Sequence, residues 1–282
     1  MQDTPQTAGV ELANWNWKAV RAFVQQRFGR VLSRSSCLNY LHRLGFVLKR
    51  PKKRLLKASV EQREAFVAAY AALREEARAQ GAPIYFVDEA HFRADAKLRA
   101  KWVLRGQPAL VDSTSPRLGE KATYYSAVCL EQGTVETMVV SGTCTAESSV
   151  AFLKELRAEH AGPLIVIWDN SPAHRGPEMR AYLATPGLNL RLVALPAYSP
   201  DFNADEGVWN WARQEVTANL CFDTAAKVRE KLDAFFVGLA ERSAEVQRRC
   251  RSALQALADA LVAAAAQSPT QPNHVDLTLA SL

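Results

Sequence analysis

An apolar run followed at once by an acidic residue occurs twice in this chain and constrains its fold more than any other feature. Residues 164–168 read Leu-Ile-Val-Ile-Trp and lead into Asp169, and residues 84–87 read Ile-Tyr-Phe-Val and lead into Asp88. Short runs of this kind, rich in β-branched and aromatic residues, are typical of buried strands. Because ligand-binding groups in α/β sheets lie beyond the ends of strands, the two acids are expected at one edge of a sheet.

A third acid, Glu206, lies near the start of a helix predicted at about 203–219. Mg2+ and Mn2+ prefer oxygen ligands and are held in proteins by a few carboxylates, water and substrate phosphate. Two such ions about 3.5–4 Å apart stabilise the attacking and the leaving oxygen of an in-line displacement. Two strands that end in acids, with an acid at a helix start, therefore predict a divalent-metal site for phosphoryl transfer.

Each of the three acids also has an ordinary structural interpretation. Asp88 could bond a loop amide at the end of its strand, and Asp169 could belong to a simple turn. Asn203 and Glu206 match a capping box, in which a polar residue caps a helix and an acid three residues later bonds back to it. Taken one at a time, the acids leave these alternatives open.

The periodic segments predict a mixed sheet covered by helices, so the expected fold class is α/β. Thr145 is the expected N-cap of a helix that begins there. Strands are expected at 84–87, 101–106, 122–130, 135–140, 164–168 and 190–195. Helices are expected at 60–80, 145–160, 176–184, 203–219, 224–241 and 243–266.

Composition excludes several classes of protein. The chain has 282 residues and is 48% hydrophobic and 23% charged, which is typical of a globular protein with one large domain and a small one. It has no apolar run of transmembrane length and no N-terminal signal pattern, which favours a cytoplasmic protein with no membrane partner. Its five cysteines are scattered without a C-x-x-C pair, which argues against a disulfide framework or a zinc site.

Positive charge is concentrated at the N-terminal end of the chain. The net charge is +6, but residues 1–59 carry twelve Lys and Arg against two acids, or +10. The rest of the chain then holds 23 basic and 27 acidic residues, or −4. The rest of the chain is therefore mildly acidic, and the basic head, residues 1–59, is expected to bind a polyanion.

The basic head has the pattern of a helix-turn-helix module. One helix is expected from about Trp17 to the stop at Gly29, and a second over 33–44 before Gly45. In that layout the second helix enters the major groove of DNA, and two ordinary packed helices are the alternative. The basic run at 49–54 suits phosphate contacts and favours DNA binding. The expected DNA-binding residues are Arg34, Ser35, Asn39, His42, Lys49, Arg50, Lys52, Lys53 and Arg54.

Four segments with distinctive residues follow one another in the larger part of the chain. They are FVDEAHF at 86–92, the W-x-x-R-G-Q segment at 102–107, WDNSPAH at 168–174 and LPAYSPDFN at 195–203, the last followed by Glu206 and Trp209. In this order they resemble the DDE transposases of the bacterial insertion sequence 630 family, within the mariner-like superfamily. The N-terminal segment from Trp17 to Lys53 resembles the winged-helix half of that family's DNA-binding region, and the likeness covers about residues 15–250.

The resemblance implies a ribonuclease-H-like mixed sheet with flanking helices, preceded by a small winged-helix or helix-turn-helix module. By motif match, Asp88, Asp169 and Glu206 are the catalytic and metal-binding acids, with Mg2+ or Mn2+ as cofactor. The 36 residues between Asp169 and Glu206 are close to the spacing of the superfamily. Asn170 and His174 are candidate substrate contacts, although His174 could equally be a satisfied loop histidine.

The implied activity is the cutting of transposon ends and the joining of the freed 3′ hydroxyl to target DNA. The implied partners are double-stranded DNA, as terminal inverted repeats and target, and a second copy of the chain in a homodimer on DNA. Two other functions remain as alternatives. One is a DNA-binding regulator derived from a truncated transposase with little or no cleavage, and the other is a general ribonuclease-H-like nuclease or integrase.

Two departures from the family pattern bear on these expectations. Ala204 and Asp205 stand where the family usually has Pro-Ile or similar, so Asp205 is a rival third carboxylate. The family also carries a further helix-turn-helix module before the winged helix, so this chain is expected to be an N-terminally short form. The expected organisation is a disordered tail at 1–14, a winged-helix module at 15–57, a catalytic domain at 58–266 and a tail at 267–282.

Overall fold

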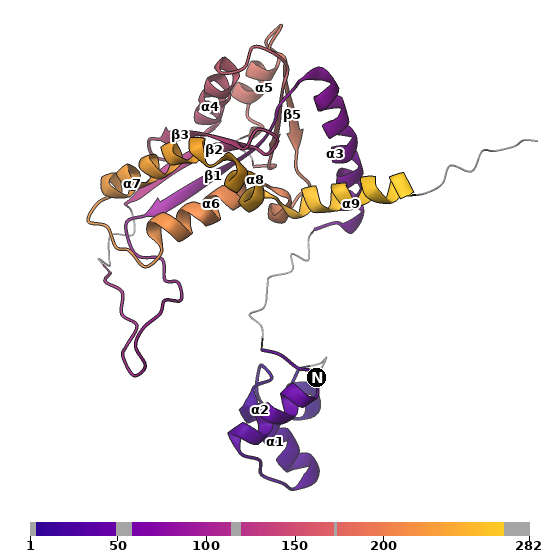
Figure 1. Cartoon of the computed structure of the whole chain (residues 1–282), viewed down its shortest axis with the longest axis vertical. Coiled ribbons are helices and arrows are strands. Elements are labelled where there is room, and N and C mark those ends of the chain that lie inside the picture. Colours follow the sequence, from indigo (N-terminus) through magenta and orange to yellow (C-terminus); the bar gives the residue numbers. More distant parts are fainter. Residues whose placement is uncertain (1–3, 49–57, 114–119, 172–173, 268–282) are drawn as a thin grey trace, which may run out of the picture. The chain divides into compact units, whose positions relative to one another are not determined.

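The computed structural model describes residues 4–48, 58–113, 120–171 and 174–267. The chain forms two compact units, Met1–Arg54 and Leu55–Leu282 (Figure 1). Within the described residues, no helix is both long and apolar enough to cross a membrane.

A mixed five-stranded sheet forms the centre of the larger unit. Its strands are β1 Ile84–Arg93, β2 Lys121–Cys129, β3 Thr134–Val140, β4 Leu164–Trp168 and β5 Leu190–Ala194. They lie in the order β3-β2-β1-β4-β5. β2 pairs antiparallel with both β1 and β3, whereas β4 pairs parallel with β1 and β5. The predicted mixed sheet is therefore confirmed.

Helices cover both faces of this sheet (Figure 1). Because side chains alternate along a strand, Tyr85 and Val87 of β1 enter one core, and Ile84 and Phe86 enter the other. The first core is completed by α4 Ala146–Ala158 and α5 Pro177–Leu183. The second is completed by α3 Val60–Gln80, α6 Asp205–Ala212, α7 Ala225–Gly238, α8 Ser243–Cys250 and α9 Ala253–Gln267. Thr145 caps α4 and makes a capping box with Ser148, as its position predicts.

The first strand is longer than the sequence predicts. The expected strand at 84–87 continues to Arg93, because β2 pairs with β1 from Tyr85 to Arg93. The parallel neighbour β4 pairs with β1 only from Ile84 to Phe86. Asp88 therefore lies inside β1, just past the point where the paired stretch of β4 ends.

Two other expectations about elements are wrong. Residues 101–106 form no strand but a loop with a turn, and the side chain of Trp102 is fully exposed. No strand of the described residues pairs with this loop, so its apolar residues have no sheet to join. The helix expected over 243–266 is broken between α8 and α9, where the hydroxyl of Ser252 accepts a hydrogen bond from the backbone N–H of Leu254 at 3.2 Å.

The described part of the smaller unit is helical. A short 3-10 helix, η1 Gln6–Ala8, precedes α1 Trp17–Phe28 and α2 Arg34–Arg43. The side chain of Asn16 caps α1, and that of Ser33 caps α2. Gly29 ends α1 with a positive φ of 65°, a conformation that favours glycine. The two helices pack against each other, with Val20 of α1 and Cys37 of α2 buried, and their positions match the predicted helix-turn-helix pair.

Candidate active site

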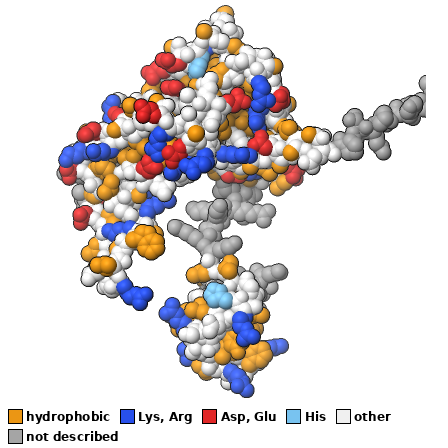
Figure 2. Space-filling model, in the orientation of Figure 1, with side chains coloured by type: hydrophobic (Ala, Val, Ile, Leu, Met, Phe, Trp, Pro, Cys, Tyr) orange, Lys and Arg blue, Asp and Glu red, His pale blue; other side chains and the backbone are white. Residues whose placement is uncertain are grey.

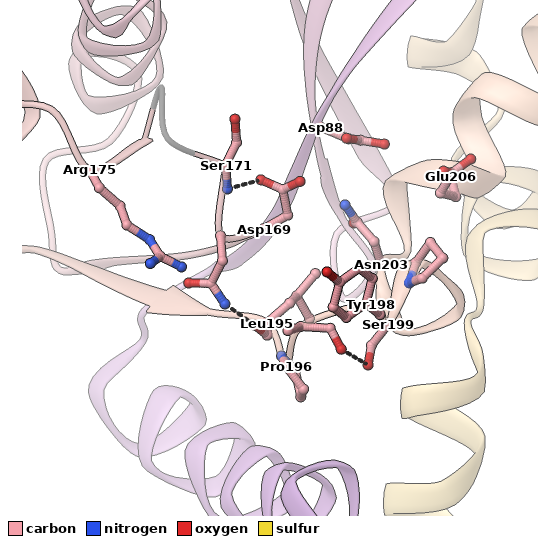
Figure 3. Close-up of a pocket in the computed structure, with 13 residues that line it drawn as sticks. Asp88, Asp169, Ser171, Arg175, Leu195, Pro196, Tyr198, Ser199, Asn203 and Glu206 are labelled. Atoms are coloured by element: carbon pink, nitrogen blue, oxygen red, sulfur yellow. Dashed lines mark hydrogen bonds between the residues drawn. The ribbon is translucent and has the colours of Figure 1, made fainter. Parts of the chain in front are cut away.

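A cavity of about 530 Å³ opens in the larger unit beside β1 and the end of β4 (Figure 3). Its walls come from β1, the segment after β4, the segment 195–200 and the start of α6. Asp88, Asp169 and Glu206 all line it. The structure thus brings the three predicted acids, which are far apart in sequence, to one cavity.

The sheet register places two of these acids together. Phe86 of β1 is the partner of Ile167 in β4. Asp88 lies two residues after Phe86, and Asp169 lies two residues after Ile167. Continuation of the parallel register would therefore set the two acids side by side. β4 ends at Trp168, and Asp169 follows directly as the chain leaves the sheet. Asp169 thus lies at the end of a parallel strand, the usual position for a ligand-binding group.

Asn203 fixes the third acid against the sheet. Its side-chain amide donates a hydrogen bond to the carbonyl oxygen of Val87 at 3.0 Å, next to Asp88. Its amide oxygen accepts a hydrogen bond from the backbone N–H of Asp205 at 3.1 Å. The start of α6 is therefore tied to β1, and Glu206, in the first turn of α6, is held at the cavity.

The capping-box interpretation of Asn203 and Glu206 is wrong. The N-cap of α6 is Ala204, which makes no side-chain cap. Asn203 lies one residue before the N-cap position. Its side-chain amide donates instead to the carbonyl oxygen of Val87 in β1. Glu206 is then not needed to complete a cap and can face the cavity.

Asp205 and Glu206 are adjacent but have different surroundings. Asp205 is fully buried, and its two carboxylate oxygens accept hydrogen bonding from the hydroxyl of Ser126, at oxygen–oxygen distances of 2.5 and 2.6 Å. Glu206 lines the cavity, whereas Asp205 does not. Burial, and then the charge of Asp88, raises the pKa of Asp205 well above its ordinary value. The geometry therefore favours Glu206 over its rival as the third acid of the site.

The cavity concentrates negative charge. Burial raises the pKa of Asp88 well above its ordinary value, and the charges of Glu206 and Glu89 raise it further. The pKa of Asp169 is lowered, chiefly by a hydrogen bond from His174. Carboxylates that raise one another's pKa values favour a cation between them.

The donor set suits a hard divalent cation, because it offers carboxylate oxygens and no sulfur. The side chains are not yet gathered around one point. In the part of the chain that the structure describes, no three His, Cys, Asp or Glu side chains form a ready set of metal ligands. The three acids surround the cavity rather than close on an ion.

The other predicted residues of this site have different positions. Asn170 lines the cavity, and its amide donates a hydrogen bond to the carbonyl oxygen of Leu195 at 2.6 Å. His174 is buried behind Asp169, with both ring nitrogens facing carboxylates. Its imidazole therefore has no ring nitrogen left for a substrate phosphate. Arg175 and Tyr198 also line the cavity, although the sequence motifs do not single them out as site residues.

The predicted DNA-binding residues divide into two groups. Arg34, Ser35, Asn39 and His42 lie on α2, and all four are exposed. The basic residues Lys49, Arg50, Lys52, Lys53 and Arg54 lie outside the described residues. The exposed polar face of α2 is thus available to a large partner.

A mixed sheet of this order, with helices on both faces, is a ribonuclease-H-like fold. The family model described as DDE superfamily endonuclease matches residues 83–229, which is more than half of the chain. The chain belongs to this family. A second model, described as winged helix-turn helix, matches residues 12–70.

A known bacterial protein is similar to this chain in sequence. The chain is 27% identical over 222 residues to a protein of Shigella sonnei described as "Insertion element IS630 uncharacterized 39 kDa protein". That match covers 78% of this chain and 63% of the relative's length. The chain is therefore similar to somewhat less than two thirds of that relative.

Solved structures share the fold. A pre-cleavage Mos1 transpososome is similar with a TM-score of 0.63 and 20% identity, covering 90% of this chain and 80% of that one. The Mos1 mariner paired end complex with Mn is similar with a TM-score of 0.62 and 21% identity, covering 89% and 78%. The Mos1 mariner catalytic domain is similar with a TM-score of 0.50 and 19% identity, covering 76% and 97%.

Proposed function

We propose that this chain is a DDE transposase, which cuts transposon ends and joins the freed 3′ hydroxyl to target DNA. The observation that carries the proposal is the cavity lined by Asp88, Asp169 and Glu206 on a ribonuclease-H-like sheet. Membership of the DDE endonuclease family supports it. The likeness to an insertion-element protein supports it as well.

Asp88, Asp169 and Glu206 would hold Mg2+ or Mn2+. When bound, a pair of such ions supplies electrostatic stabilisation to the attacking and leaving oxygens at phosphorus. Half-buried Asp88 lies between the other two acids in Figure 3, and the charges of both raise its pKa, which suits a shared ligand. The printed descriptions of two Mos1 structures include Mn and Mg, which supports the choice of cofactor.

Other residues of the cavity would bind and orient the DNA strand. Arg175 lines the wall on the Asp169 side, and a guanidinium suits a phosphate through two parallel hydrogen bonds. The amide of Asn170 is already bonded to Leu195, which fixes the segment that follows Asp169. These residues would position the phosphodiester against the acids.

Double-stranded DNA is the proposed partner, as transposon ends and as target. The Mos1 relatives include a paired-end complex with the left transposon end, which supports this assignment. The winged helix-turn-helix match over 12–70 and the exposed polar face of α2 support end binding by the smaller unit. A homodimer on DNA completes the proposal.

The alternative function, a DNA-binding regulator without cleavage, would not require three carboxylates around an open cavity. The deciding experiment is a cleavage assay with Mg2+ on a duplex that carries the terminal repeats flanking the coding region. The wild-type chain should cut at the repeat ends, and Asp88→Asn should not. Glu155→Gln is the matched control, because Glu155 is an exposed acid of α4 on the other face of the sheet and should leave cleavage unchanged. Equal cleavage by Asp88→Asn and wild type would reject the proposed site.

A further inference from the structure

A buried histidine links two carboxylates of the catalytic region. His174 has a side chain only 2% exposed, and its ring stacks on the indole of Trp168 with centroids 3.8 Å apart. Trp168 is itself fully buried and packs edge-on against Tyr125 and Phe152. The imidazole therefore has a fixed plane.

Both ring nitrogens of His174 face carboxylate oxygens. Nε2 lies 2.7 Å from Oε1 of Glu89, and Nδ1 lies 2.9 Å from Oδ1 of Asp169. A neutral imidazole could donate to only one of them, because its other nitrogen would be an acceptor. An ionised carboxylate can only accept, so this placement needs a hydrogen on each ring nitrogen. Nδ1 also lies 3.3 Å from the backbone carbonyl oxygen of Asp169.

The two donors at Asp169 meet the same oxygen. The backbone N–H of Ser171 donates to Oδ1 at 2.9 Å, and Nδ1 of His174 approaches that oxygen as well. No hydrogen bond from the described residues reaches Oδ2. Since Asp169 lines the cavity, this arrangement fixes the carboxylate by one oxygen and leaves the other for the cavity (Figure 3).

Glu89 anchors the link in the sheet. It follows Asp88 in β1, so its side chain leaves the opposite face of the strand. Its side chain is 17% exposed and reaches His174 on the side of α4 and α5. One strand therefore carries Asp88 directly and holds Asp169 through Glu89 and His174.

We infer that Glu89 and His174 are positioning residues, which hold the Asp169 carboxylate ready for the divalent ion. This inference rests on the proposed function, because it takes Asp169 as an ion ligand. Hydrogen-bonded partners of ligands orient them, and their loss typically costs about 10–100-fold in metal affinity or activity. The positioning matters here because, among the described residues, the acids of the cavity do not already lie together as a ready set of metal ligands.

The test is Mn2+ affinity of the full chain without DNA, measured by electron paramagnetic resonance of unbound Mn2+. His174→Ala should weaken affinity by about 10–100-fold, and Glu89→Gln by about 10-fold. His174→Gln should recover part of the loss, because its amide can still donate to Asp169. The matched control is His91→Ala, since His91 lies on the same strand but bonds Thr123 at 3.0 Å and should leave affinity unchanged.

Circular dichroism and thermal melting would show which variants fold. A folded His174→Ala with wild-type affinity would overturn the inference, as would equal losses in folded His174→Ala and His174→Gln. If His174→Ala does not fold, Glu89→Gln decides, because it keeps the shape of the side chain and removes only charge. Unchanged affinity in Glu89→Gln would then overturn the inference.

The same titration separates the inference from the proposed function. Wild type that binds no Mn2+, or Asp169→Asn that binds it as wild type does, would reject the proposed metal site itself. A further readout is nitrogen-15 NMR of the metal-free wild type. Both ring N–H groups of His174 should give slowly exchanging signals, and the Nε2 signal should shift in Glu89→Gln. Rapid exchange at both nitrogens would contradict the link.

Discussion

The two units of this protein differ in where their functional residues come from. In the smaller unit the candidate contacts Arg34 and Asn39 lie within two turns of one helix, exposed to solvent. In the larger unit the candidate acids come from a strand, from the segment that directly follows another strand, and from a helix, and Asp88 is half-buried. Figure 2 shows Lys and Arg side chains over the smaller unit, while the larger one carries both signs. The candidate DNA contacts thus lie close together in sequence, whereas the candidate acids are brought together only by the tertiary fold.

The largest expected effect is the loss of cleavage without the loss of binding. Asp169→Asn keeps the shape of the side chain but removes a ligand charge from a site that works by charge stabilisation. Cleavage in Mg2+ should fall by at least about 10²–10³-fold, the cost of losing one electrostatic stabiliser. Affinity for the terminal-repeat duplex, measured by anisotropy in EDTA, should stay near that of wild type. A variant that cuts normally would break the contrast between the units.

The second prediction concerns the basic run outside the described residues. Each phosphate neutralised contributes about −0.9 to the slope of log affinity against log salt on duplex DNA. Changing Lys52, Lys53 and Arg54 together to Ala should flatten that slope by up to about 3. The measurement is a salt titration of binding to cognate and random duplexes. If the slope of log affinity against log salt stays unchanged, the phosphate contacts come from the larger unit, and the basic head is only a solvated surface.

The third prediction concerns α2. Arg34→Ala or Asn39→Ala should reduce the preference for the cognate end by about 1–3 kcal/mol, the value of one good base contact. Total affinity for random DNA should change less, because base contacts specify and phosphate contacts position. Competition binding between cognate and random duplexes measures both. An equal loss on both duplexes would assign α2 to phosphate contacts.

The smallest expected effect is on stability and depends on pH. Asp205 has a raised pKa through burial and then through Asp88, so the folded state holds a proton that the unfolded state releases. Stability is therefore lost as the pH rises above the unfolded pKa of about 3.9. In the metal-free protein, Asp205→Asn should raise Tm near pH 7 and change it little near pH 4, by about 2–4 °C per kcal/mol relieved.

The Ser126 hydroxyl can still donate to the amide oxygen in Asp205→Asn, so packing is kept. Glu155→Gln, on the exposed side of α4, serves as the control and should leave the pH dependence of Tm unchanged. If Asp205→Asn gains no more in Tm at pH 7 than at pH 4, ionisation of Asp205 does not destabilise the folded protein.

Local patterns predicted most of the sheet. The apolar runs at 84–87 and 164–168 mark β1 and β4, because buried strands need continuous apolar sequence. The length of β1 could not be predicted, since residues from Asp88 onward are strand only because β2 pairs with them. The loop carrying Trp102 has strand-like composition but no partner strand in the described sheet.

The candidate site was predictable only where its residues belong to a recognisable sequence motif. The acids Asp88, Asp169 and Glu206 carry recognisable motifs, and the fold brings them to one cavity. The link from Glu89 to His174 spans 85 positions and depends on which face of β1 each side chain leaves. Strict alternation after Asp88 could have placed Glu89 on the other face, but nothing local shows that His174 lies there.

Iron-directed cleavage of the protein backbone tests the central claim most directly. With added hydrogen peroxide and ascorbate, Fe2+ placed in an Mg2+ site reduces the peroxide to hydroxyl radicals, which cut the chain next to the bound ion. If Asp88, Asp169 and Glu206 hold the divalent ion, cuts should map beside these three residues, and excess Mg2+ should suppress them. Asp169→Asn should abolish the pattern. Cuts elsewhere, or cuts at these residues that persist in Asp169→Asn, would contradict the assignment of this cavity as the catalytic metal site.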